Sequence, residues 1–197
     1  MRAAIIVAHP DDETIWAGGL VLRNPGWEWI VLSLCRAHDP DRAPKFRRAC
    51  DRLGATGVMS DLDDGAPPKP IDASGEITDR ILAFLPGTRW DLCLTHGRNG
   101  EYGHERHRQV HTQVLRLVRD GTIGCDEFWA FAYECDTAAG ACKPAPWADV
   151  LVELTAAELA EKKRVVRELY GYAEQSFEVN ACISPECFKR LKGPQKD

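Results

Sequence analysis

No stretch of this 197-residue chain is apolar over the ~20 consecutive residues that a membrane-spanning helix needs. Basic residues are also few: 25 Lys and Arg stand against 30 Asp and Glu, and the net charge of −5 argues against binding nucleic acid by neutralising phosphates. The opening residues, MRAAIIVAHPDD, are not expected to act as a signal peptide, because charged residues soon interrupt the apolar run. We therefore expect a cytoplasmic protein that binds neither nucleic acid nor a membrane.

The eight cysteines include no CxxC pair, so the sequence does not support a structural zinc site. Without an export signal, most of these cysteines are expected to be free thiols. Cys182 and Cys187 could form a bridge under oxidation, but the favoured interpretation is two reduced thiols. The glycine pair in AGGLVL matches neither GxGxxG nor GxxxxGK[ST], so no nucleotide-binding loop is predicted.

What remains is a globular composition, with 44% apolar and 28% charged residues. Hydrophobic periodicity predicts strands at 3–8, 28–35, 57–62, 91–95, 128–134 and 148–154, and helices at 13–23, 44–53, 76–85, 104–119 and 155–174. A loop is predicted at 63–70 and an irregular tail after about residue 178. This alternation implies a single α/β domain over 1–197: a Rossmann-like, doubly wound, mostly parallel sheet with helices on both faces.

A histidine and three carboxylates follow the first predicted strand, in the run His9-Pro10-Asp11-Asp12-Glu13. In doubly wound folds, ligands bind beyond the carboxyl ends of the strands, which is where this run is expected. Adjacent carboxylates repel one another and are costly to desolvate, so a bound cation is the natural compensation. An acidic helix N-terminus favoured by the helix dipole would explain the acids, but not the histidine.

A second cluster follows the fourth predicted strand, in THGRNGEYGHERHRQVH, where four of the six histidines lie within sixteen residues. His104, His107 and His111 are spaced i, i+3 and i+7, which places them on one side of a helix. His111 fits a solvated helix face equally well. His96 is expected to support a ligand or a loop rather than to bind metal directly.

The two clusters together predict a metal site. His9 and Asp12 can chelate one ion, and a histidine of the second cluster completes the three protein ligands that a hydrolytic zinc uses beside an open position for water. Asp11 could take the proton of that water, and a histidine that does not bind metal could protonate the leaving group. Two alternatives use the same ligands: an iron(II) oxygenase, which is more usual in β-sandwich scaffolds, and a metal-holding, sugar-binding module without activity.

AHPDDE (8–13) together with GHERH (103–107) resembles the PIG-L/LmbE-like family of zinc-dependent N-deacetylases. Weaker similarity in RLGA (52–55), DLDDG (61–65) and KKRVVRELYGYAEQS (162–176) extends along the chain. The resemblance implies a hydrolase that removes acetyl groups from N-acetylglucosamine-type sugars or conjugates, with another small-molecule amide as the alternative substrate. It also implies Zn²⁺, or otherwise Fe²⁺ or Co²⁺, held by His9, Asp12 and His107.

The same resemblance assigns the remaining roles. Asp11 becomes the general base, and His104 the general acid or the electrostatic partner of the intermediate. Tyr102 matches a tyrosine that contacts the oxyanion. Arg42 and Asp64 are assigned to binding the substrate, a small N-acetylated sugar, and self-association into a homo-oligomer is left open.

Overall fold

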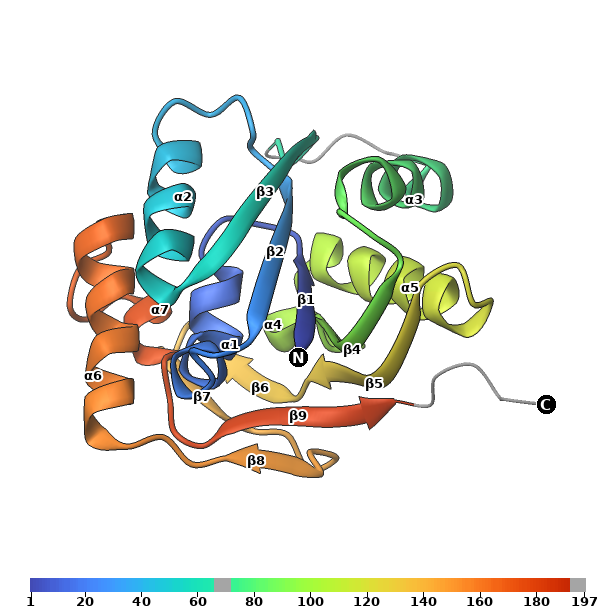
Figure 1. Ribbon diagram of the computed structural model, residues 1–197. Coiled ribbons are helices and arrows are strands. Elements are labelled where there is room, and N and C mark those ends of the chain that lie inside the picture. Colours follow the sequence, from blue (N-terminus) through green and yellow to red (C-terminus); the bar gives the residue numbers. More distant parts are fainter. Residues whose placement is uncertain (66–71, 192–197) are drawn as a thin grey trace.

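The computed structural model of the protein describes residues 1–65 and 72–191. A seven-stranded sheet in the order β3-β2-β1-β4-β5-β9-β8 forms its centre (Figure 1). The strands are β1 (Arg2–Val7), β2 (Glu28–Cys35), β3 (Ala55–Leu62), β4 (Arg89–Thr95), β5 (Gly124–Phe131), β8 (Val150–Val152) and β9 (Glu186–Leu191). Strands β1 to β5 pair in parallel, and β9 pairs antiparallel with β5 and β8. The predicted mostly parallel, doubly wound sheet is therefore confirmed.

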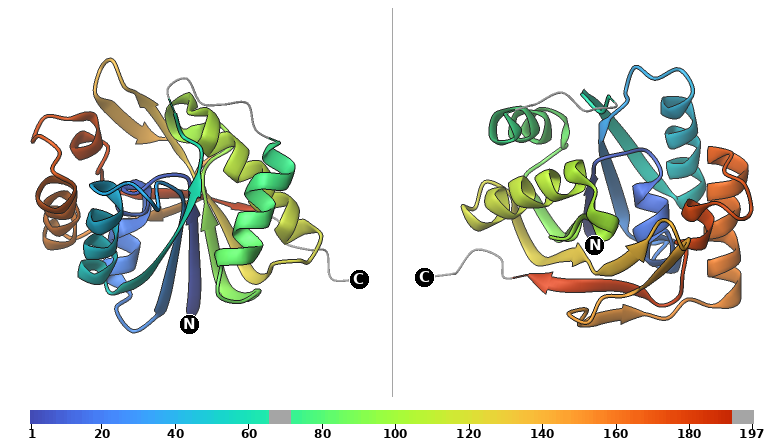
Figure 2. Two further views of the ribbon diagram at one scale, coloured as in Figure 1. Left: turned by 90° about the horizontal axis from the view of Figure 1, so that it is seen from above. Right: turned by 180° about the vertical axis from the view of Figure 1, so that it is seen from behind.

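Both faces of the sheet carry helices (Figure 2). Apolar side chains form a core on each face. In β1, Ile5 and Val7 pack into the core on one face while Ala4 and Ile6 pack on the other, as expected for a central parallel strand. The first face carries α1 (Asp12–Arg23) and α2 (Arg42–Leu53), with α6 (Ala156–Arg164) and the π-helix η1 (Val165–Tyr170) packed against them; the second carries α3 (Ala73–Phe84) and α5 (Glu105–Arg119). Within the described residues, no helix combines the length and apolar character needed to cross a bilayer.

The C-terminal segment corrects the prediction of an irregular tail after about residue 178. It forms the short helix α7 (Phe177–Asn180) and then β9, which lies inside the central sheet between β5 and β8; residues 192–197 lie outside the described part. The strand carries a fully buried Glu186, whose carboxylate accepts hydrogen bonds from the amides of Gly19 and Leu20, each at 2.7 Å, and lies 2.6 Å from Lys162 Nζ. In a sequence, a charged residue of a buried ion pair looks the same as one that faces solvent. Glu186 therefore made this strand look like a solvent-exposed segment, and the strand was missed.

Smaller differences from the prediction have local causes. Gly18 and Gly19 both lie inside α1, and a Cβ at Gly19 would come within 3.0 Å of Glu186 Oε1 and 2.4 Å of Leu154. The strand predicted at 128–134 divides into β5 and β6 (Tyr133–Asp136), and the one predicted at 148–154 shortens to β8. The helix predicted over 155–174 ends as η1, and the loop predicted at 63–70 lies partly outside the described residues.

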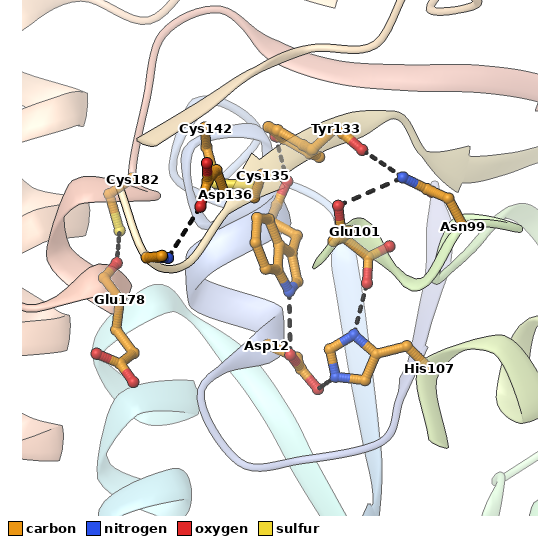
Figure 3. Close-up of a disulfide and its surroundings, with 12 residues drawn as sticks. Asp12, Asn99, Glu101, His107, Tyr133, Cys135, Asp136, Cys142, Glu178 and Cys182 are labelled. Carbon is orange, nitrogen blue, oxygen red and sulfur yellow. Dashed lines mark hydrogen bonds and ion pairs between the residues drawn. A yellow bond between two sulfur atoms is a disulfide. The ribbon is translucent and has the colours of Figure 1, made fainter. Parts of the chain in front are cut away.

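Six of the eight cysteines are free thiols, including Cys182 and Cys187. The exception is a disulfide between Cys135 and Cys142. These residues lie directly opposite each other in the hairpin of β6 and β7 (Ala141–Pro144), which packs close to the site described below (Figure 3). Only the register of the hairpin brings the two cysteines together, so the pair had no signature in the sequence.

Candidate metal and catalytic site

The structure brings together three side chains from distant parts of the chain. His9 and Asp12 lie where β1 passes into α1, and His107 lies in the first turn of α5. His9 Nδ1 is 3.0 Å from His107 Nε2 and 3.3 Å from Asp12 Oδ2, and His107 Nε2 is 3.4 Å from the same oxygen. Ligand atoms about 2.1 Å from a tetrahedral zinc lie about 3.4 Å apart, so this spacing fits a single ion.

When both imidazoles are neutral, these three atoms are all acceptors, because a hydrogen bond holds the proton of each ring on its far side. His107 Nδ1 donates to Glu101 Oε2 at 2.6 Å, and His9 Nε2 donates to Asp64 Oδ1 at 3.0 Å. In the neutral, metal-binding form of each ring, the other nitrogen then presents a lone pair to Asp12. Three such acceptors repel unless a cation lies among them. Burial lowers the pKa of His9, but the hydrogen bonds and charges of Asp12 and Asp64 raise it to about 10, so a proton supplies the positive charge when no metal is bound. A divalent metal ion, which these residues fit, would replace that proton.

Glu101, which the sequence analysis missed, supports His107 from behind (Figure 3). It lies in the four-residue helix α4 (Gly100–Gly103), is buried, and also accepts hydrogen bonds from His96 Nδ1 at 3.0 Å and from the Gly97 amide at 2.6 Å. His96 Nε2 accepts from the Ala8 amide at 2.9 Å, which ties the end of β1 to this network. The available signal was a carboxylate in a glycine-flanked loop, six residues before a candidate ligand.

The loop after β3 supports the other histidine. Asp64 contacts His9 through one carboxylate oxygen and Arg36 through the other, with Arg36 Nη2 at 2.8 Å. The neighbouring Asp63 accepts a hydrogen bond at its carbonyl from Arg106 Nε at 2.9 Å, and Arg106 is buried in α5. Asp64 therefore orients a candidate ligand, a role that the sequence analysis did not give it.

Asp11 lies beside the three acceptors in a strained backbone conformation. Its φ of 113° is rare for a residue other than glycine, and its amide donates to Glu13 Oε2 at 3.0 Å. Its Oδ2 accepts hydrogen bonds from Arg42 Nη1 at 3.0 Å and from the hydroxyl of Tyr172. Burial and the charge of Asp12 raise the pKa of Asp11 to about 7, although Tyr172 and Arg42 lower it. A carboxyl group that titrates near neutrality can accept a proton and return it.

A pocket of about 180 Å³ opens over this group, and Asp11, Arg42, Asp64, Tyr102 and His104 all line it. The ring centroid of His104 lies 4.7 Å from that of His9 and 4.5 Å from that of His107. Its Nδ1 is buried and has no hydrogen-bond partner among the described residues, and burial lowers its pKa. The ring centroid of Tyr102 lies 5.7 Å from that of His104. Both side chains are therefore placed beside the candidate metal position.

The remaining two histidines lie away from the pocket lining. His111 is 8% exposed, and its Nδ1 donates to the carbonyl of His96 at 2.8 Å, so the solvated-face interpretation of His111 is wrong. His38 is exposed, and among the described residues its side chain hydrogen-bonds to Asp61, with its Nδ1 at 2.7 Å from Oδ2.

The fold is a doubly wound α/β sheet, and histidines and acids that could hold a metal ion gather at the carboxyl edge of its central strands, where such folds bind ligands. A sequence model of the family described as GlcNAc-PI de-N-acetylase, PIG-L, matches residues 4–118, which is more than half of the chain. The protein belongs to the PIG-L family.

Individual relatives are distant. The 1D-myo-inositol 2-acetamido-2-deoxy-alpha-D-glucopyranoside deacetylase of Actinosynnema mirum is 23% identical over 186 residues, which cover 76% of this chain and 66% of that protein. The chain spans 50–66% of the length of the curated deacetylases it matches.

Solved structures show the same fold at low identity. N,N'-diacetylchitobiose deacetylase from Pyrococcus horikoshii has a TM-score of 0.69 and 11% identity, covering 96% of this chain and 83% of that one. GalB, the 4-carboxy-2-hydroxymuconate hydratase from Pseudomonas putida, has a TM-score of 0.66 and 14% identity, covering 100% and 99%. Because a deacetylase and a hydratase share this fold, the structural likeness shows the fold and not the reaction.

Proposed function

We propose that the protein is a metal-dependent N-deacetylase that removes the acetyl group from an N-acetylglucosamine-type sugar or sugar conjugate. The observation that carries the proposal is the group of three facing acceptors, His9, Asp12 and His107, with the carboxylate of Asp11 beside them at the floor of an open pocket. The deacetylase activity of the curated relatives and the description of the family favour a sugar amide as the substrate. In this proposal residues 1–197 act as one catalytic domain.

His9, Asp12 and His107 would hold the metal, with Zn²⁺ as the first choice and Fe²⁺ or Co²⁺ as alternatives. Two imidazole nitrogens and one carboxylate oxygen are donors that suit each of these ions. When bound, the ion supplies Lewis acidity, which lowers the pKa of a water molecule and polarises the amide carbonyl.

The other pocket residues would carry the proton transfers. Asp11 accepts the proton of the attacking water, and His104 donates a proton to the departing amine. Tyr102 faces the oxygen that becomes negatively charged when the carbonyl is attacked. Arg42 and Asp64 line the pocket, where they can contact the sugar. Each acid–base group typically contributes ~10²–10⁴ in rate.

Acetate and amine release from a panel of N-acetylated sugars and sugar conjugates tests this proposal. Zinc-loaded protein should release equal amounts of both products without oxygen or a keto acid, and metal-free protein should not. Asp11→Ala should retain its metal while losing ~10²–10⁴ in kcat. An Asp11→Ala variant as active as wild type would remove the base assignment.

The same panel separates the alternatives. Tight sugar binding without turnover would indicate a non-catalytic module, and oxygen-dependent turnover would indicate an iron oxygenase. Cleavage of unrelated amides alone would indicate an amidase with another substrate. Addition of water to an unsaturated acid, with no acetate released, would place the protein with the hydratase that shares its fold.

A further inference from the structure

Two tyrosines from one short segment reach the two acids that flank Asp12. Tyr170 ends η1, and its hydroxyl donates to Glu13 Oε1 at 2.7 Å. Gly171 then turns the chain with a left-handed φ of 85°, a conformation that favours glycine. The hydroxyl of Tyr172, on the other side of this turn, donates to Asp11 Oδ2. The sequence analysis assigned no role to either tyrosine.

The contact between Tyr172 and Asp11 is part of a closed triangle. Arg42 Nη1 donates to the Tyr172 hydroxyl oxygen at 2.7 Å and to Asp11 Oδ2 at 3.0 Å, and its guanidinium carbon lies 5.2 Å from the centroid of the Tyr172 ring. Because the hydroxyl oxygen accepts from Arg42, its proton is directed to Asp11. Both donors therefore act on the same carboxylate oxygen.

The other oxygen of Asp11 is left unpaired. Within the described part of the chain, Asp11 Oδ1 accepts no hydrogen bond, and Asp11 lines the pocket. Two donors on one oxygen fix the rotation of the carboxylate about its last side-chain bond. A carboxylate without them could rotate freely, because this torsion has a broad and shallow preference.

We propose that Tyr172 is a positioning residue for Asp11: it fixes Oδ2 so that Oδ1 faces the reacting water. This inference rests on the proposed deacetylase function, in which Asp11 is the base. Correct orientation of a reacting group is a large part of enzymatic rate enhancement, so the loss of the hydroxyl should lower kcat. Tyr172 does not need to touch the substrate to have this effect.

The test is a double-mutant cycle that combines Tyr172→Phe with Asp11→Ala, assayed on the best substrate of the sugar panel. In the wild-type background, Tyr172→Phe should lower kcat by about ten- to a hundredfold, because a hydrogen bond to a charged group contributes a free energy of that size. KM and zinc content should be unchanged. In the Asp11→Ala background, the same substitution should change kcat by less than about twofold, because a residue that acts only through Asp11 has nothing left to position.

Tyr170→Phe is the matched control, since it also removes a tyrosine hydroxyl from this segment. The hydroxyl of Tyr170 lies one residue before the turn and makes a buried hydrogen bond to Glu13. Tyr170→Phe should change kcat by the same factor in the wild-type and Asp11→Ala backgrounds, and it should lower the Tm. An equal loss from Tyr172→Phe in both backgrounds would give Tyr172 this structural role and overturn the proposal. A higher KM at constant kcat would make it a substrate contact instead, and an unchanged kcat would also overturn the proposal.

Crystal structures of the zinc-loaded wild type and Tyr172→Phe decide the matter independently of any substrate. The wild type should show one Asp11 carboxylate orientation, and the variant a rotated or divided one. An unchanged carboxylate in the variant would overturn the positioning role even in a protein that deacetylates nothing. Absence of turnover by the wild type would refute the proposed function alone.

Discussion

Replacing Glu101 with Gln should weaken metal binding without changing any candidate ligand. The carboxylate of Glu101 accepts three hydrogen bonds, from His107 Nδ1, from His96 Nδ1 and from the amide of Gly97. A glutamine side chain has one acceptor oxygen and an NH₂ group in place of the other oxygen. Whichever way the amide is turned, its NH₂ group must face at least one N–H donor in a buried site.

The magnitude follows from two independent considerations. A hydrogen bond to a charged group contributes about 1.5–3 kcal/mol, and the removal of its acceptor leaves a buried donor unsatisfied. The partners that orient metal-bound histidines typically account for ~10- to 100-fold in metal affinity. Since a tenfold change in affinity corresponds to about 1.4 kcal/mol, the two ranges overlap, and the zinc Kd of Glu101→Gln should rise by about 10- to 100-fold.

Competition for zinc against a chromophoric chelator measures this change directly. Glu105→Gln is the matched control: it makes the same chemical change at an exposed position that begins α5, where, within the described residues, the side chain accepts a hydrogen bond from Gln109. The control should have the Kd of wild type. Equal zinc affinities for Glu101→Gln and Glu105→Gln would refute the claim that Glu101 fixes the metal-binding form of His107.

Three other substitutions test other parts of the structure. His107→Ala should lose its metal because one of three ligands is removed, and full occupancy by elemental analysis would require a different ligand set. Lys162→Met leaves the carboxylate of Glu186 buried without its cation, so the free energy of unfolding measured in urea should fall by about 3–5 kcal/mol. The control Lys163→Met should be nearly neutral. Equal effects of the two substitutions would contradict the ion-pair argument. Gly19→Ala should cost about 1–3 kcal/mol, because its methyl group would overlap the methyl carbons of Leu154 and crowd the same carboxylate. A wild-type Tm would show that Leu154 or α1 can shift to make room.

The features of the site that could be predicted are those tied to local sequence patterns. Alternating apolar and amphipathic segments predicted the parallel strands, and the carboxyl ends of such strands meet at one edge of the sheet. That rule was enough to bring His9 and Asp12 into the same neighbourhood as His107, although 98 residues separate the two histidines. Helical spacing reinforced the prediction by placing the histidines of the second cluster on one side of a helix.

The features that could not be predicted depend on contacts between remote segments. Glu101 is one polar residue in a loop, and only its left-handed backbone, with a φ of 57°, brings it behind His107. Tyr172 lies near the end of a predicted helix, and Glu186 lies in the segment that was predicted as an irregular tail. Each is explained only by what it touches, and no periodicity records a contact across more than 150 residues.

The acids of the first motif and their tyrosine partners are made at very different times during synthesis on the ribosome. Glu13 precedes Tyr170 by 157 residues, and Asp11 precedes Tyr172 by 161. At translation speeds of about 5–20 residues per second, this interval lasts roughly ten to thirty seconds. A growing polypeptide that has emerged through residue 118 already contains every candidate metal ligand. It still lacks the tyrosine hydroxyls that donate hydrogen bonds to Asp11 and Glu13. These acids therefore gain their tyrosine partners late in translation, after the family-matched stretch is complete.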